Sequence, residues 1–98
     1  MPYMQSISFS TDRKDEVLEL MSRWSADSIQ TGTARRGTML EDRAAPGSFV
    51  MGVSFESAES AAENSDRPET GAFAEQFAAL CTEGPEFREF DIVAVYGD

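Results

Sequence analysis

Three segments of this chain alternate between apolar and polar residues with the period of a β-strand. They are Tyr3 to Phe9, Phe49 to Phe55 and Phe87 to Tyr96. A fourth and weaker strand is expected at Ala34 to Asp42, where Met39 and Leu40 are the only large apolar residues. The Pro46-Gly47 pair that follows suits the central positions of a tight turn, so this weaker strand and the next one are predicted to form a hairpin.

Two other segments have the period of a helix. The first runs from an N-cap at Asp12 to about Gln30, with one apolar stripe made of Val17, Leu20, Met21 and Trp24. The second begins at an N-cap, Ser57, and is broken before Pro68, because proline fits the first turn of a helix far better than its interior. Its two pieces are predicted at Ala58 to Glu63 and Pro68 to Thr82, the latter with a buried stripe of Phe73, Phe77, Leu80 and Cys81.

The resulting order is β-α-β-β-α-β, which predicts an α+β fold of the ferredoxin-like type. In that fold a four-stranded antiparallel sheet carries two helices on one face. At 98 residues the chain is long enough for a single domain, expected to span residues 1–98, with its own hydrophobic core.

The two faces of the predicted sheet differ in the size of their side chains. The face expected under the helices is bulky and carries Ile7, Phe9, Phe49, Met51, Val53, Phe55, Phe90, Ile92 and Tyr96. The opposite face is small and mildly apolar, with Met4, Ser6, Ser8, Val50, Gly52, Ser54, Val93 and Val95. A solvated sheet face is normally polar, so a second copy of the chain is expected to pack against this one and form a homodimer.

Charge limits the partners of the protein. The net charge is −10, and residues 48–98 carry eleven acidic and two basic side chains. This distribution argues against nucleic-acid binding and against an anionic membrane surface. No apolar run is long enough to span a membrane and the N-terminus does not resemble a signal peptide, so a soluble cytoplasmic protein is expected. The single Cys81 agrees with a reducing compartment.

The composition also removes several kinds of chemistry. The chain has no histidine and one cysteine, which excludes Ser–His and Cys–His nucleophiles and any axial imidazole for haem. We therefore expect no cofactor and no metal. The acidic residues Glu56, Glu59 and Glu63 and the basic pair Arg35-Arg36 are interpreted as solvated surface groups.

The broken second helix is similar to one known family. The segment Ser57-Ala58-Glu59-Ser60-Ala61-Ala62-Glu63-Asn64, with Pro68 four residues later and then Phe73, resembles the dimeric α/β-barrel superfamily, in its antibiotic-biosynthesis-monooxygenase-like branch. The resemblance implies the same element order and a dimeric α/β barrel. Its members include cofactor-free oxygenases, haem-degrading enzymes and isomerases, so it indicates fold more than reaction. Many members carry histidine where this chain has Asn64.

Three residues are candidates for a ligand-binding pocket between sheet and helices: Trp24, Asn64 and Tyr96. Their alternative interpretation is structural, with Trp24 and Tyr96 as core aromatics and Asn64 as a helix C-cap. Three functions stay open. The first is binding of a small organic molecule, aromatic or polyketide-like, with no reaction assigned, and the second is a cofactor-free monooxygenase or isomerase of an aromatic substrate. The third is a non-catalytic protein-interaction module, which would have a filled core and an exposed apolar helix face.

Overall fold

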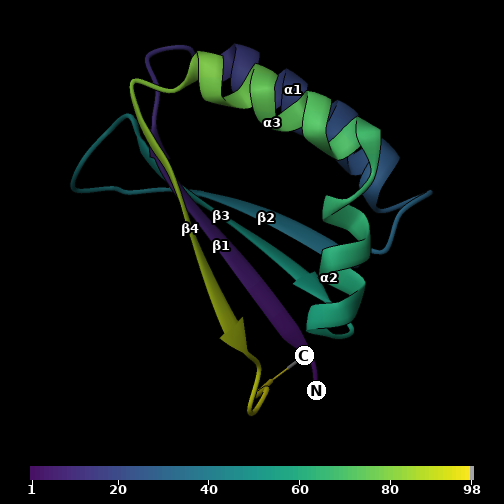
Figure 1. Ribbon diagram of the computed structural model, residues 1–98. Coiled ribbons are helices and arrows are strands. Elements are labelled where there is room, and N and C mark those ends of the chain that lie inside the picture. Colours follow the sequence, from purple (N-terminus) through teal and green to yellow (C-terminus); the bar gives the residue numbers. More distant parts are fainter. Residues whose placement is uncertain (98) are drawn as a thin grey trace.

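The computed structural model describes residues 1–97 (Figure 1). Its elements, in chain order, are β1 (Tyr3–Ser10), α1 (Lys14–Ser28), β2 (Arg36–Glu41), β3 (Ser48–Phe55), α2 (Ala58–Ser65), α3 (Pro68–Leu80) and β4 (Glu83–Asp91). The four strands form one antiparallel sheet in the order β2-β3-β1-β4. Figure 1 shows all three helices on the same side of this sheet, with α1 and α3 packed together above it. The predicted ferredoxin-like α+β fold is confirmed.

The core lies between the helices and the inner face of the sheet. Pairing of β1 with β3 sets Tyr3 opposite Phe55, Ile7 opposite Met51 and Phe9 opposite Phe49, so these rows face the helices together. The predicted stripe of α1 packs onto them, because Val17, Leu20, Met21 and Trp24 are all buried. Phe77 of α3 is 1% exposed and meets Phe9 edge-on, with 4.7 Å between the ring centroids.

The last strand differs from its prediction in register. It begins at Glu83 and ends at Asp91, and it pairs Phe87 with Ile7 and Phe90 with Met4. Phe87 therefore faces the helices and Phe90 faces outward, which reverses the predicted facing of Phe90. Gly84, at a φ of 80°, lies where the β1–β4 register shifts, and Gly84 and Pro85 both belong to the strand. Ile92, Val93, Val95 and Tyr96 lie beyond the strand.

The start of α1 also corrects a detail. Its N-cap is Arg13, and no side chain caps it, whereas Asp12 was expected in that role. The hydroxyl of Thr11 instead accepts a hydrogen bond from the Arg13 N–H at 3.0 Å and donates one to the Leu80 carbonyl at 2.6 Å. Thr11 thus ties the beginning of α1 to the end of α3. Ser57 is the N-cap of α2, as predicted, and its Oγ accepts from the Ser60 N–H at 3.1 Å.

The outer face of the sheet carries large apolar side chains that stay partly exposed within residues 1–97. Met4 is 37% exposed, Val50 38%, Phe90 43% and Leu40 56%. Leu40 lies opposite Val50 and Met4 lies opposite Phe90, so they form two cross-strand pairs.

Within residues 1–97, no helix has both the length and the apolar character needed to cross a membrane.

Candidate functional site

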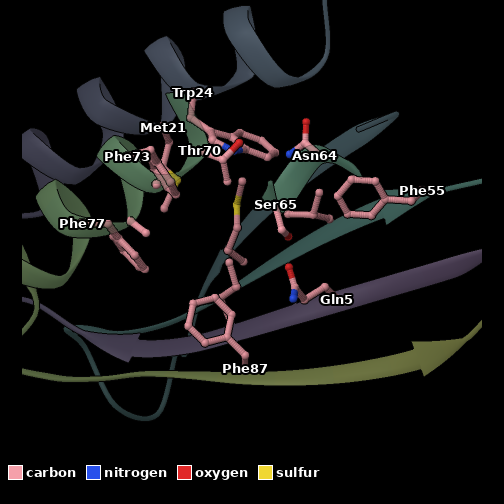
Figure 2. Close-up of a pocket in the computed structure, with 15 residues that line it drawn as sticks. Gln5, Met21, Trp24, Phe55, Asn64, Ser65, Thr70, Phe73, Phe77 and Phe87 are labelled. Carbon is pink, nitrogen blue, oxygen red and sulfur yellow. The ribbon is translucent and has the colours of Figure 1, made fainter. Parts of the chain in front are cut away.

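A cavity of about 220 Å³ lies between the sheet and the helices (Figure 2). Its walls are mainly apolar and aromatic, and four uncharged polar residues interrupt them. The lining residues are Gln5, Ile7, Met21, Trp24, Met51, Val53, Phe55, Asn64, Ser65, Thr70, Gly71, Phe73, Ala74, Phe77 and Phe87. None of these described residues has an ionisable side chain, so the cavity favours a neutral ligand.

Small residues on α3 explain why the core is not filled here. Gly71 and Ala74 lie one turn apart, on the stretch of α3 that borders the cavity. Gly71 has no side chain and Ala74 has only a methyl group, so neither fills the space between Phe73 and Phe77 of the same helix and the strands. The sequence pattern marked the aromatic residues of this helix as core, but it did not show that two small neighbours would leave the core open.

The mouth of the cavity is at the β4 edge. Phe87 lines the cavity and is also 52% exposed, so its ring is reached from both the inside and the solvent. Ser65, Gly71 and Ala74 likewise line the cavity and are exposed. A ligand would therefore enter between the C-terminal end of α2, the first turns of α3 and the ring of Phe87.

Trp24 forms part of the helical wall of the cavity. It is 8% exposed, and its ring packs against Phe73 with 6.0 Å between centroids. The same two rings border a shallow groove on the outer surface between α1 and α3, so they separate the cavity from that surface. Gly37 of β2 makes room for the indole, because a Cβ there would lie 2.9 Å from Met51 Cε and 3.1 Å from Trp24 Cζ3.

Asn64 is buried at 3% exposure, near the end of α2. Its Oδ1 accepts from the Thr33 N–H at 3.4 Å and its Nδ2 donates to Ser28 Oγ at 3.5 Å, both long for hydrogen bonds. Its backbone carbonyl also accepts from the Arg67 N–H at 3.3 Å. The Thr33 contact orients the amide, and Figure 2 shows its nitrogen pointing toward Trp24. Because neither side-chain bond is short, the amide keeps capacity for a ligand.

An ion pair holds the break between α2 and α3 in place. Arg67 Nη2 lies 3.1 Å from Asp27 Oδ1 and 3.2 Å from Thr31 Oγ1, so it connects the break to the end of α1. The hydroxyl of Thr33 donates to the Ser60 carbonyl of α2. Together these contacts set the distance between α1 and the α2–α3 break, and with it the place of Asn64 relative to Trp24.

The structure brings together two of the three candidate residues. Trp24 and Asn64 line the same cavity, as predicted, although a ligand-binding role for either stays a prediction. Tyr96 does not line it: the side chain is 90% exposed and lies beyond the end of β4, so its predicted place on the inner face is wrong. The register of β4 puts Phe87 on the inner face of this strand, and Phe87 supplies the aromatic wall that was assigned to Tyr96.

The lining residues that the sequence analysis missed include Gln5, Ser65, Thr70 and Phe87. Gln5 had a visible signal, since it was the one strongly polar residue on the core-facing stripe of the first strand. Ser65 and Thr70 lie on either side of the helix break, where their orientation depends on the angle between α2 and α3. Phe87 was hidden by the register of β4.

The groups outside the cavity offer little reactive chemistry. Within residues 1–97, no cluster of three His, Cys, Asp or Glu residues could hold a metal ion. Burial raises the pKa of the Cys81 thiol, which donates to the Phe77 carbonyl at 3.3 Å and packs against the core. Arg35 pairs with Glu56 at 3.3 Å, and both side chains are exposed.

Solved structures with the same fold include proteins of the antibiotic biosynthesis monooxygenase type. SnoaB, a cofactor-independent oxygenase from Streptomyces nogalater, matches with a TM-score of 0.85 and 17% identity over 99% of this chain and 98% of its own. A provisionally assigned antibiotic biosynthesis monooxygenase from Nitrosomonas europaea matches with a TM-score of 0.82 and 16% identity, covering 98% and 94%. Rv0793 from Mycobacterium tuberculosis matches with a TM-score of 0.82 and 14% identity, covering 99% and 100%.

At these identities the likeness shows the fold alone. No protein-family model matches the sequence, and no curated protein matches it. The chain therefore has the fold of the antibiotic-biosynthesis-monooxygenase-like proteins, which the broken second helix had indicated.

Proposed function

We propose that this protein binds a small, uncharged aromatic molecule in the cavity between its sheet and helices. The observation that carries the proposal is the cavity itself, with aromatic walls, a buried asparagine and no ionisable lining residue among those described. Its volume of about 220 Å³ exceeds the ~150 Å³ of an engineered cavity that binds benzene and is below the ~300 Å³ of the smallest typical drug pockets. One or two aromatic rings fit inside, whereas a larger polyketide-like molecule would extend through the mouth past Phe87.

Calorimetric titration with ethylnaphthalene, a neutral two-ring probe, tests this proposal. Trp24→Ala removes one aromatic wall and is expected to weaken binding at least tenfold, which corresponds to about 1.4 kcal/mol. Leu18→Ala is the matched control, because Leu18 lies on the same helix, is 41% exposed and does not line the cavity. Absence of binding to the unaltered protein, or equal weakening by both variants, would refute the proposal.

The protein is further proposed to act as a cytoplasmic homodimer that pairs through the outer face of its sheet. The support is the exposed group Met4, Leu40, Val50 and Phe90, which another sheet could bury. Gly52 lies on this face, and a Cβ there would meet nothing closer than Met4 Sδ at 3.8 Å. Gly52→Arg should therefore leave the monomer folded and disrupt only the pairing. Light scattering that gives 10.8 kDa for the unaltered chain at micromolar concentration would contradict the dimer.

A cofactor-free monooxygenase or isomerase is the second candidate. It is favoured by the fold shared with SnoaB, a cofactor-independent oxygenase, and by the uncharged polar groups of the cavity, which could stabilise an enolate. Because the described lining supplies neither a general base nor a counter-charge, the substrate would have to ionise by its own acidity, and its enolate would depend on hydrogen bonds from the polar groups alone. The rate should then follow the pKa of the substrate. The assay mixes the protein with an acidic aromatic ketone in metal-free buffer and measures oxygen consumption. Protein-dependent oxygen consumption would support a monooxygenase, whereas rearrangement of the ketone without oxygen consumption would support an isomerase.

The third candidate, a non-catalytic interaction module, predicted a filled core. The cavity and its converging polar groups argue against it. It would regain support if light scattering gave a monomer, if ethylnaphthalene did not bind and if the aromatic ketone did not react. The outer sheet face would then stay exposed in solution and free for another protein.

A further inference from the structure

The hydroxyl of Thr70 is a buried polar group without a partner. Among the buried side-chain nitrogen and oxygen atoms of the described residues, Thr70 Oγ1 is the one that makes no hydrogen bond. Such orphaned groups are rare in folded proteins, since a buried hydroxyl that makes no hydrogen bond has lost its bonds to water without replacing them. Thr70 lines the cavity, but Oγ1 itself is buried, so a ligand in the cavity reaches the hydroxyl only when the side chain turns about χ1.

The local backbone explains why the hydroxyl has no partner. Thr70 is the third residue of α3, and the Arg67 carbonyl lies one turn before it. A threonine in a helix often donates to the carbonyl three or four residues earlier. Here the Arg67 carbonyl already accepts two N–H groups, from Thr70 at 3.1 Å and from Gly71 at 3.2 Å. The hydroxyl is left free to donate and to accept.

The surroundings of Thr70 limit what could satisfy it. Figure 2 shows Thr70 and Asn64 entering the cavity from the helical side, whereas Gln5 and Phe87 enter from the sheet. No lysine, arginine or histidine lines the cavity among the described residues, so a carboxylate would lose its hydration without gaining a counter-charge. A neutral oxygen, as in a ketone or a phenol, can hydrogen-bond the Thr70 hydroxyl without the cost of removing a charge from water.

We propose that Thr70 is a specificity-determining residue, whose hydroxyl turns toward the cavity when the ligand binds and hydrogen-bonds a keto or phenolic oxygen of the aromatic molecule. The inference rests on the proposed binding function and narrows its ligand class to oxygen-bearing aromatics. In this interpretation the empty protein keeps an unsatisfied hydroxyl, and the ligand oxygen satisfies it. An aromatic hydrocarbon of the same shape would enter the cavity and leave the hydroxyl unpaired, so the site discriminates against it.

The test compares two probes of similar shape, acetylnaphthalene and ethylnaphthalene, substituted at the same ring position. Calorimetry measures the ratio of their dissociation constants for the unaltered protein, Thr70→Val and Thr70→Ser. Valine replaces the hydroxyl with a methyl group of similar size, and serine keeps the hydroxyl. Thr82→Val serves as the control, because Thr82 is exposed and lies outside the cavity.

The preference for the ketone over the hydrocarbon is expected to fall about five- to thirty-fold in Thr70→Val, the size of one lost hydrogen bond. Thr70→Ser and Thr82→Val should keep the preference. If Thr70→Val leaves the preference for the ketone unchanged, or Thr70→Ser lowers it equally, the inference about Thr70 is wrong. Binding of the hydrocarbon probe would in that case still support a ligand site in the cavity. If neither probe binds the unaltered protein, the proposed function fails and the inference falls with it.

A second measurement needs no ligand. Because valine removes an unsatisfied buried hydroxyl, empty Thr70→Val should unfold at a urea concentration equal to or above that of the unaltered protein. A clear loss of stability would show that the hydroxyl has a structural role in the empty protein, and the proposal would then be wrong.

Discussion

Two glycines that border the same site should respond in opposite directions to the same substitution. Gly32 follows α1, and a Cβ there would lie 2.7 Å from the Ser28 carbonyl and would collide with Asn64 Oδ1 and Arg67 Nη1. Gly71 is exposed within α3, and a Cβ there would have no heavy atom within 4 Å. Alanine at Gly32 therefore adds a clash, whereas alanine at Gly71 adds helix propensity.

The magnitudes follow from these contacts. The arginine can move away from a new methyl group at Gly32, but the Ser28 carbonyl belongs to the backbone and already accepts from the Ala34 N–H at 3.1 Å. We expect Gly32→Ala to lower the free energy of unfolding by about 1–3 kcal/mol, the usual cost of overpacking. Gly71→Ala should raise it by about 0.5–1 kcal/mol, because alanine loses less backbone entropy than glycine in a helix.

Urea unfolding monitored by the fluorescence of Trp24, the single tryptophan, measures both effects. The protein concentration must be equal in all samples, because a dimer would make the apparent stability depend on it. In a domain of 98 residues each kcal/mol shifts the melting temperature by about 4–8 °C, so thermal melts provide a check. Gly32→Ala should also weaken ethylnaphthalene binding, since the displaced Asn64 amide borders the cavity. A Gly32→Ala variant as stable as the unaltered protein would refute the contact geometry on which this prediction depends.

Four further outcomes are expected. Burial and the hydrogen bond to Glu89 raise the pKa of Tyr3 to about 12. The protonated Tyr3 therefore stabilises the folded protein fully below the pKa near 10 of an unfolded tyrosine, and this contribution is lost as the pH rises through 12. Ultraviolet titration of the Tyr96→Phe variant measures the ionisation of Tyr3 alone, and ionisation near pH 10 would contradict the prediction. Because burial raises the pKa of Cys81, its thiol should react with a disulfide reagent more slowly than free cysteine, and equal rates would show an open thiol. Ser57→Ala should cost about 1 kcal/mol in urea unfolding through loss of the α2 N-cap, whereas Ser57→Asp should keep most of that stability. Elemental analysis of unsupplemented protein should find no stoichiometric transition metal, and bound zinc or iron would contradict the carboxylate-poor, histidine-free cavity.

The local pattern of the chain determined the elements and their order. Alternation marked Tyr3 to Phe9 and Phe49 to Phe55 as strands, and the 3.6-residue period placed Val17, Leu20, Met21 and Trp24 on one buried stripe. Pro68 located the break between α2 and α3, because proline is tolerated in the first helical turn and not in the interior. These features depend on neighbours a few residues apart, so a sequence pattern contains them.

The last strand was decided by tertiary pairing. Alternation alone cannot tell which of two residue sets faces the core, and a one-residue shift exchanges them. The register shift at Gly84 and the pairing of Phe87 with Ile7 set the facing of the strand, so Phe87 lines the cavity and Phe90 faces outward. Tyr96 was assigned to the inner face by continuing the same pattern past Asp91, where the strand ends.

The cavity likewise belongs to the tertiary structure. Trp24 and Asn64 could be proposed from their own helices, but they are forty positions apart and line one cavity only in the folded chain. There α1 packs on α3, and contacts of Arg67 and Thr33 join the α2–α3 region to the end of α1. The empty space depends on the small size of Gly71 and Ala74 where α3 passes over the sheet, and the unpaired hydroxyl of Thr70 depends on the Arg67 carbonyl being already occupied. A void and an unpaired group are properties of how elements pack together, and no single segment of the chain records them.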